Sequence, residues 1–250
     1  DIGISMGITG TDVAKDTANM ILVDDNFATI VNAVEEGRII FANIRKFVSF
    51  LLSCNIAEVL IVFLSILFGL PAPLTPIQLL WLNLVTDAFP ALALGVEPGE
   101  KDIMKKKPRN PKDSIISGDL RRSLTLQSLA ITGSVLLAYV IGLNLIFPGN
   151  IAGAHTMVFA TLITSELLRS FSVRSTKYTL KELGLFSNKK LIQANLLSFA
   201  LLLLVMYIPA VRELFELEMI TWQWIVILII AFIPLTLGEI HKKLSRKNEN

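Results

Sequence analysis

Six apolar stretches, each of about 20 residues, dominate this 250-residue chain. They cover approximately residues 47–69, 75–95, 123–147, 154–172, 191–210 and 220–240. Each is long enough to cross the hydrocarbon core of a bilayer as a helix. Because lipid offers the backbone no hydrogen-bond partners, such spans must be helices. The sequence therefore predicts a mainly α-helical, polytopic membrane protein with six transmembrane helices.

The composition excludes several other classes of protein. Apolar residues make up 53% of the chain, and the mean hydropathy is +0.62, which is too high for an ordinary soluble or disordered domain. The formal net charge of +2 gives no basic surface for nucleic acid, so no nucleic-acid partner is expected. The single cysteine excludes an intramolecular disulfide and a cysteine-based zinc site.

The first part of the chain is polar. Residues 1–38 lack a basic segment followed by an apolar core, so no signal peptide is expected. Glycines within residues 1–12 indicate a strand with tight turns, without the Gly-Lys-Ser/Thr of a Walker A motif. A helical pattern starts near Thr29 and continues into the first span as a stalk. We expect a soluble segment at 1–38 and a membrane domain at 39–250, and the missing initiator Met suggests a fragment.

Basic residues lie on alternate sides of the spans and so predict the topology. Lysine and arginine are abundant in 97–122, in 173–190 and in the tail after the last span. The loops 69–76 and 148–154 contain neither residue. By the positive-inside rule, both termini are expected in the cytoplasm.

Polar side chains inside the apolar spans carry the functional information. Three spans contain such groups at helical spacings of three or four, so that those within one span share a face. They are Asn55 and Glu58, then Asn83, Thr86 and Asp87, and then Glu166 and Arg169. Ionisable groups at membrane depth are costly and usually functional. Hydrogen bonding between helices would explain one or two of these residues, but not three carboxylates.

The chemistry of this set points to a hard cation. Carboxylate, carboxamide and hydroxyl oxygens are the ligands that Ca²⁺ prefers, and no soft ligands cluster with them in the sequence. Cys54 precedes Asn55 and would point about 100° away from it on a helix, so we interpret it as a small core residue. Pro90 lies three residues after Asp87 and predicts either an ion-binding break in the helix or a simple kink.

Several motifs together resemble a known family. These are Gly3-Ile-Ser-Met-Gly7, Asp24-Asp-Asn-Phe27, Ser53-Cys-Asn-Ile-Ala-Glu58, Leu79-Leu-Trp-Leu-Asn-Leu-Val-Thr-Asp87 and Leu94-Gly-Val-Glu-Pro98. The chain resembles the C-terminal part of type II P-type ATPases, the calcium-transporting pumps of the sarco/endoplasmic-reticulum type. The resemblance covers nearly the whole chain. It implies the end of a HAD-like α/β phosphorylation domain followed by the last six of ten membrane helices.

The resemblance also implies roles for individual residues. The metal ligands would be Asn55, Glu58, Asn83, Thr86, Asp87 and Glu166, with Asp87 bridging two sites. Arg169 stands where Asn is usual and would modify a site, either by pairing with Glu166 or Glu58 or by reaching the nearby cytoplasmic surface. No catalytic residue is expected here. The phosphorylated Asp and the parts that bind ATP and Mg²⁺ would lie outside this chain.

The implied function is that of the ion-binding membrane part of an ATP-driven calcium pump. Calcium would leave the cytoplasm, with H⁺ carried in the opposite direction because desolvated carboxylates favour protonation once calcium is gone. The partners would be the bilayer and the remainder of the pump polypeptide. The alternatives are a P-type pump for Mn²⁺, Na⁺ or H⁺, and a six-helix secondary cation transporter or channel subunit. The short tail and plain loops indicate a prokaryotic plasma membrane.

Overall fold

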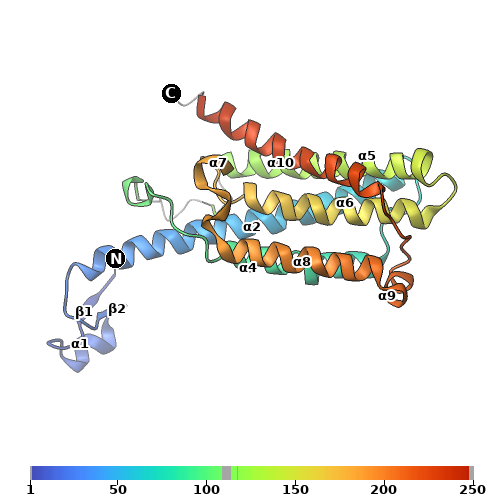
Figure 1. Ribbon diagram of the computed structural model, residues 1–250. Coiled ribbons are helices and arrows are strands. Elements are labelled where there is room, and N and C mark those ends of the chain that lie inside the picture. The colour runs from blue at the N-terminus through green and yellow to red at the C-terminus, as the bar shows by residue number, and fades with distance from the viewer. Residues whose placement is uncertain (1, 109–113, 117, 248–250) are drawn as a thin grey trace. The chain divides into compact units, whose positions relative to one another are not determined.

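The computed structural model describes residues 2–108, 114–116 and 118–247 (Figure 1). The chain divides into two compact units, which are described separately. The first unit consists of residues 1–42 and 99–110, and the second of residues 43–98 and 111–250. The division at 42/43 falls four residues after the boundary that we predicted at 38/39.

A small β-α-β motif opens the first unit. Strand β1 (Ile4–Met6) and strand β2 (Met20–Leu22) pair in parallel, and helix α1 (Asp12–Thr17) connects them. A side chain at Gly7 would approach the carbonyl oxygen of Leu22 to 2.7 Å, and one at Gly10 would overlap that of Met6. The chain therefore turns too tightly after β1 for any residue larger than glycine, as the sequence predicted.

Asp25 fixes the turn that follows β1. Its carboxylate accepts hydrogen bonds from the amides of Ile8 at 2.7 Å and Thr9 at 2.8 Å, and another from the hydroxyl of Thr9. These hydrogen bonds stabilise the charged form and lower the pKa of Asp25 below its usual value. The stability that these hydrogen bonds give the turn is therefore complete above the ordinary carboxyl pKa. It is lost as the pH falls through the lowered pKa of Asp25.

We expect Asp25→Asn to loosen this turn at neutral pH, as strong acid would loosen it in the unmodified chain. Amide exchange at Ile8 and Thr9, corrected for the intrinsic effect of pH, should become several-fold faster. The exposed Asp16, changed to Asn, provides the matched control. Equal protection in both variants would show that the carboxylate does not hold the turn.

Helix α2 (Thr29–Leu67) is 39 residues long and starts where the sequence predicted. No proline or turn cluster interrupts it, which allows one helix to include both the stalk and the first span. Within the first unit, Arg38 donates hydrogen bonds to the carbonyl oxygens of Ile103 (3.0 Å) and Lys106 (2.8 Å). These bonds hold the short 3₁₀ turn η2 (Ile103–Lys105) against the stalk.

The second unit is a helical bundle. After α2 it contains α3 (Pro76–Trp81), the π-helical turn η1 (Leu82–Thr86), α4 (Ala88–Leu94), α5 (Gly118–Ile141), the π-helical turn η3 (Gly142–Ile146), α6 (Ile151–Ser172), α8 (Lys189–Tyr207) and α10 (Gln223–Lys247). The connections contain α7 (Leu180–Leu183), η4 (Leu185–Ser187) and α9 (Pro209–Leu214). Among the described residues, six helical segments are long and apolar enough to span a membrane, which confirms the prediction.

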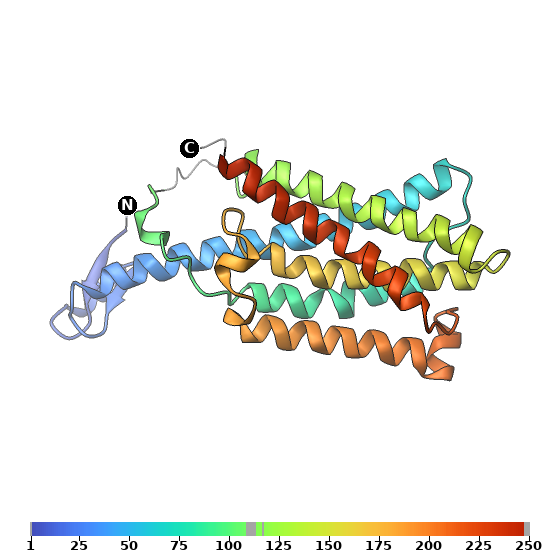
Figure 2. The ribbon, with the colours of Figure 1, turned by 45° about the horizontal axis from the view of Figure 1, so that its top comes forward.

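Helix α6 lies at the centre of this bundle. In the most apolar 18-residue stretch of α6, 78% is buried. The corresponding share in the other five spans is 28–44%. It packs against α5, α8 and α10, and α10 crosses α5 and α6 obliquely (Figure 2). A side chain at Gly238 of α10 would overlap the amide of Gln127 and lie 3.1 Å from the hydroxyl of Ser172. The absence of a side chain at Gly238 allows α10 to approach α5 and α6 closely.

A buried ion pair joins the segments that leave α4 and α6. Glu97 is 5% exposed and Arg174 is 1% exposed, and the guanidinium donates to one carboxylate oxygen at 2.8 Å. The other oxygen accepts from the side-chain amide of Asn188, the residue that caps α8. Arg174 also donates to the carbonyl oxygen of Gly184 and to Ser187. One pair therefore connects the ends of three spanning helices.

Candidate functional site

Three helical segments direct acidic side chains to one place in the bundle. Glu58 comes from α2, Asp87 from the junction of η1 and α4, and Glu166 from the middle of α6. All three are buried, with exposed fractions between 1% and 5%. The candidate site is therefore built at membrane depth from segments that lie far apart in the sequence.

The π-helical turn η1 sets the position of Asp87. The amide of Asp87 bonds to the carbonyl oxygen of Leu82, five residues earlier, and the hydroxyl of Thr86 donates to the same oxygen at 2.9 Å. Such one-turn π bulges are frequent at functional sites. Because this turn is wider than an α-helical turn, Thr86 and Asp87 are buried while Asn83 is exposed. The face that the sequence predicted for these three residues assumed α geometry, and Asn83 still reaches the site by donating to Glu58.

Pro90 is not the point at which this segment departs from α geometry. It is the third residue of α4, within the first turn, where a missing backbone N–H breaks no hydrogen bond inside the helix. The irregular segment comes earlier, at 82–86. The carbonyl oxygen of Thr86, which would face the missing N–H, accepts from the hydroxyl of Ser198 on α8 at 3.1 Å instead.

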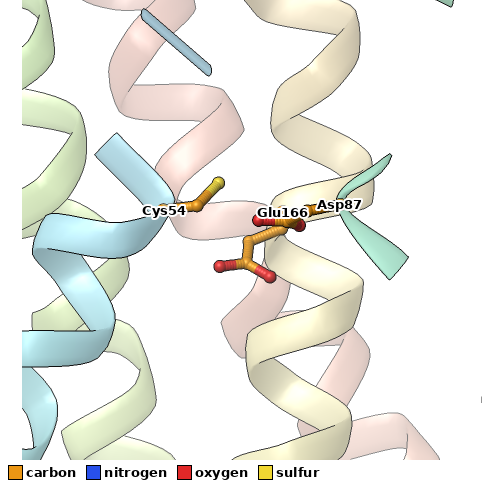
Figure 3. Close-up of side chains that lie close together, drawn as sticks. All are labelled: Cys54, Asp87 and Glu166. Carbon is orange, nitrogen blue, oxygen red and sulfur yellow. The ribbon is translucent and has the colours of Figure 1, made fainter. Parts of the chain in front are cut away.

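Cys54, Asp87 and Glu166 form a tight group. One ligand atom from each, the sulfur and two carboxylate oxygens, lie within 4.8 Å of one another (Figure 3). Within the described part of the chain, neither oxygen of Asp87 or Glu166 has a hydrogen-bond partner, and one oxygen of Glu58 also has none. Five buried acceptors therefore lack donors, which is costly unless a cation or protons neutralise them.

The predicted carboxamides lie beside this group rather than in it. Asn83 donates to a carboxylate oxygen of Glu58 at 2.7 Å and thereby joins α2 to η1. Asn55 is exposed, and its amide donates to the carbonyl oxygen of Leu51 in its own helix. The structure thus brings together Glu58 with Asn83, and Asp87 with Glu166.

Comparison with known proteins places this architecture in a family. A family model described as "Cation transporting ATPase, C-terminus" matches residues 71–244. The chain belongs to this family. The matched region contains η1, α4 and α6, so it includes Asp87 and Glu166.

Individual relatives of this chain include bacterial and animal proteins. Calcium-transporting ATPase 1 of Bacillus cereus is 41% identical over 263 residues, covering 99% of this chain and 29% of that protein. Calcium-transporting ATPase of Bacillus subtilis is 44% identical over 235 residues, covering 94% and 26%. The human calcium-transporting ATPase type 2C member 1 is 39% identical over 252 residues, covering 100% and 27%. The chain spans less than a third of the length of these relatives.

Cys54 is buried in the core, as we interpreted it from the sequence, but it also lies beside the candidate site, which we did not predict. It lies four residues before Glu58, on the same face of α2, and its sulfur is close to the carboxylates of Asp87 and Glu166. We judged its direction from Asn55, whose amide bonds to the carbonyl oxygen of Leu51 in its own helix. The i, i+4 spacing to Glu58 was the signal that could have placed it correctly.

Helix α6 contributes further oxygen atoms that the sequence did not single out. The buried hydroxyls of Thr161, Thr164 and Ser165 have no hydrogen-bond partner among the described residues. Isolated hydroxyls in an apolar span are common, and they usually bond to their own helix. The sequence did not show that these hydroxyls are buried, because their burial follows from the position of α6 at the centre of the bundle.

Arg169 occupies a position that neither of our two interpretations described. It is 1% exposed, so it does not reach the surface, and no described carboxylate lies within 4.0 Å of it. Its guanidinium lies over the ring of Phe50, 5.9 Å from the centroid, and donates weakly to the carbonyl oxygen of Phe50 at 3.4 Å. It also lines a small polar cavity of about 20 Å³ together with Ser49, Gln127 and Lys242.

Proposed function

We propose that this chain is the ion-binding membrane part of an ATP-driven calcium pump. The observation that carries the proposal is the set of five buried carboxylate oxygens without hydrogen-bond donors, contributed by Glu58, Asp87 and Glu166. Ca²⁺ binds six to eight oxygens and tolerates irregular geometry, so it fits such a set better than Mg²⁺ does. The relatives named as calcium-transporting ATPases support the same ion.

The proposed calcium ligands are those that the sequence indicated: Asn55, Glu58, Asn83, Thr86, Asp87 and Glu166. The carboxylates would supply most of the charge, and Asn83 would orient Glu58 through the bond between them. ATP and Mg²⁺ would bind to parts of the pump outside this chain, and residues 1–38 would form the end of its phosphorylation domain. We also propose that both termini lie in the cytoplasm of a prokaryotic cell.

The direct test is calcium uptake by vesicles that contain the whole pump. Uptake should require ATP and should stop with vanadate, which excludes a secondary transporter. Replacement of Ca²⁺ by Mn²⁺ or Na⁺ distinguishes the rival cations. Uptake driven by an ion gradient without ATP would contradict the proposal.

We expect protons to move against calcium. When calcium leaves, the buried negative charges of Glu58, Asp87 and Glu166 need another cation, because an isolated carboxylate at this depth is costly. Binding of calcium should then release protons. A pH-sensitive dye inside the vesicles measures this, with ionophores that short-circuit passive leaks. Calcium uptake without an opposing proton flux would exclude proton exchange.

We expect Arg169 to limit the pump to one calcium ion per cycle. Its buried positive charge, three residues from Glu166 on α6, would disfavour a second divalent cation. The ratio of bound calcium to phosphoenzyme should be close to one and should rise towards two in Arg169→Asn. Half-buried Arg212, changed to Asn, is the control for loss of one arginine. A ratio of two in the unmodified pump would exclude this role.

A further inference from the structure

A groove between α5 and α10 has the properties of a lipid site. Its volume is about 690 Å³, within the range of pockets that hold small molecules. Arg121 and Arg122 lie at one end, and the remaining lining residues are mainly apolar. The lining consists of Arg121, Arg122, Thr125, Leu126, Leu129, Ala130 and Leu237.

Helical spacing creates this arrangement. The six lining residues of α5 recur at intervals of one and three, so they form one continuous face of the helix. Leu237 forms the opposite side of the groove from α10, which packs against α5 at an oblique angle (Figure 2). Leu129 is 57% exposed and Leu237 is 41% exposed, so the apolar part opens towards the bilayer.

The two arginines determine the chemistry of the ligand. Both are exposed in the first turns of α5, and no residue that the structure describes forms an ion pair with either of them. A guanidinium binds phosphate oxygens in a bidentate manner, which a lysine ammonium cannot do. Basic pockets between spanning helices at the cytoplasmic surface are suited to anionic headgroups.

We propose that this groove binds one anionic phospholipid. The phosphate would lie between Arg121 and Arg122, and one acyl chain would follow Leu126, Leu129 and Leu237 along the groove. A transmembrane helix of a partner protein fits less well, because it would place apolar side chains against two exposed guanidinium groups. Free inorganic phosphate would leave the apolar part of the groove unused.

Native mass spectrometry of the whole protein in detergent can test the proposal. The protein is titrated with phosphatidylglycerol, with phosphatidylcholine, and with inorganic phosphate as competitor. We expect one phosphatidylglycerol to bind in preference to phosphatidylcholine and to resist the inorganic phosphate. Each basic side chain near an anionic headgroup contributes about fivefold in affinity, so Arg121→Gln with Arg122→Gln should weaken phosphatidylglycerol binding about 25-fold.

Two further variants separate headgroup recognition from general charge. Arg121→Lys with Arg122→Lys keeps the charge but loses the bidentate geometry, so binding should fall between the unmodified and the Gln variants. Lys189→Gln with Lys190→Gln removes an exposed basic pair from the first turn of α8 and should leave binding unchanged. Equal losses in the two Gln pairs would show a diffuse charge effect and overturn the proposal.

A last variant tests the apolar part of the groove. Leu129→Trp changes an exposed position, so the fold should tolerate it, and the larger side chain should obstruct the acyl chain and lower phosphatidylglycerol binding. Unchanged binding in this variant, or displacement of the lipid by inorganic phosphate, would mean that only the headgroup is recognised. Failure of the intact protein to bind phosphatidylglycerol would also overturn the proposal, because another polypeptide segment would then cover the groove.

Discussion

Asp87→Asn is expected to abolish activation of phosphorylation by calcium while phosphorylation from inorganic phosphate persists. Asp87 supplies two buried, unpartnered oxygens and lies between α2 and α6, so its charge is the one that the proposed site can least replace. Loss of an outer-shell partner already costs 10–100-fold in metal affinity, so loss of this ligand should cost about 100-fold or more.

The measurement is phosphoenzyme formation from ATP over a range of free calcium concentrations. Asn keeps the volume of Asp87, so the bundle should remain intact, and phosphorylation from inorganic phosphate checks this directly. Glu213→Gln removes one exposed negative charge from the same unit and should leave the calcium dependence unchanged. Near-normal calcium activation in Asp87→Asn would remove Asp87 from the ligand set.

Arg174→Ala should be the most destabilising change outside the site. It would leave the 5% exposed carboxylate of Glu97 without its charged partner and would remove the bonds to Gly184 and Ser187. Breaking a buried pair in this way costs about 3–5 kcal/mol. Equilibrium denaturation in detergent micelles measures the loss in free energy of unfolding.

Two further variants show whether the effect comes from the pair. Lys181→Ala removes an exposed charge from α7 and should change stability little. Combining Arg174→Met with Glu97→Gln removes both charges and should recover much of the loss, because no buried charge is then left unpaired. A loss below about 1 kcal/mol in Arg174→Ala would mean that water or another side chain compensates Glu97.

The helices of this protein could be predicted from sequence because hydropathy alone determines them. The six predicted apolar stretches correspond to the six helical spans of the structure. The uninterrupted helical pattern after Thr29 also predicted the start of α2. The ends differ by a few residues. The last helix continues to Lys247, beyond the predicted residue 240, because nothing in its sequence stops a helix where the apolar stretch ends.

The site could be predicted only in part. The three carboxylates stood out because charge is rare in an apolar span. The spacing of four residues to Glu58 indicates that Cys54 shares its helix face, but its approach to Asp87 and Glu166 depends on how α2 lies relative to the segments that carry them. The hydrogen bonds of η1 were equally hidden, because the neighbouring α8 supplies the donor for the carbonyl oxygen of Thr86.

This last contact has a dynamic consequence. A carbonyl group that bonds inside its own helix is fixed as long as the helix exists, whereas the carbonyl of Thr86 is held by a hydroxyl on another helix. A single neutral hydrogen bond of this kind contributes only about 1 kcal/mol. A small sliding movement of α8 would therefore release the backbone directly beside Asp87. The segment that carries Asp87 is thus adjustable at one peptide unit, while the rest of the bundle can stay rigid.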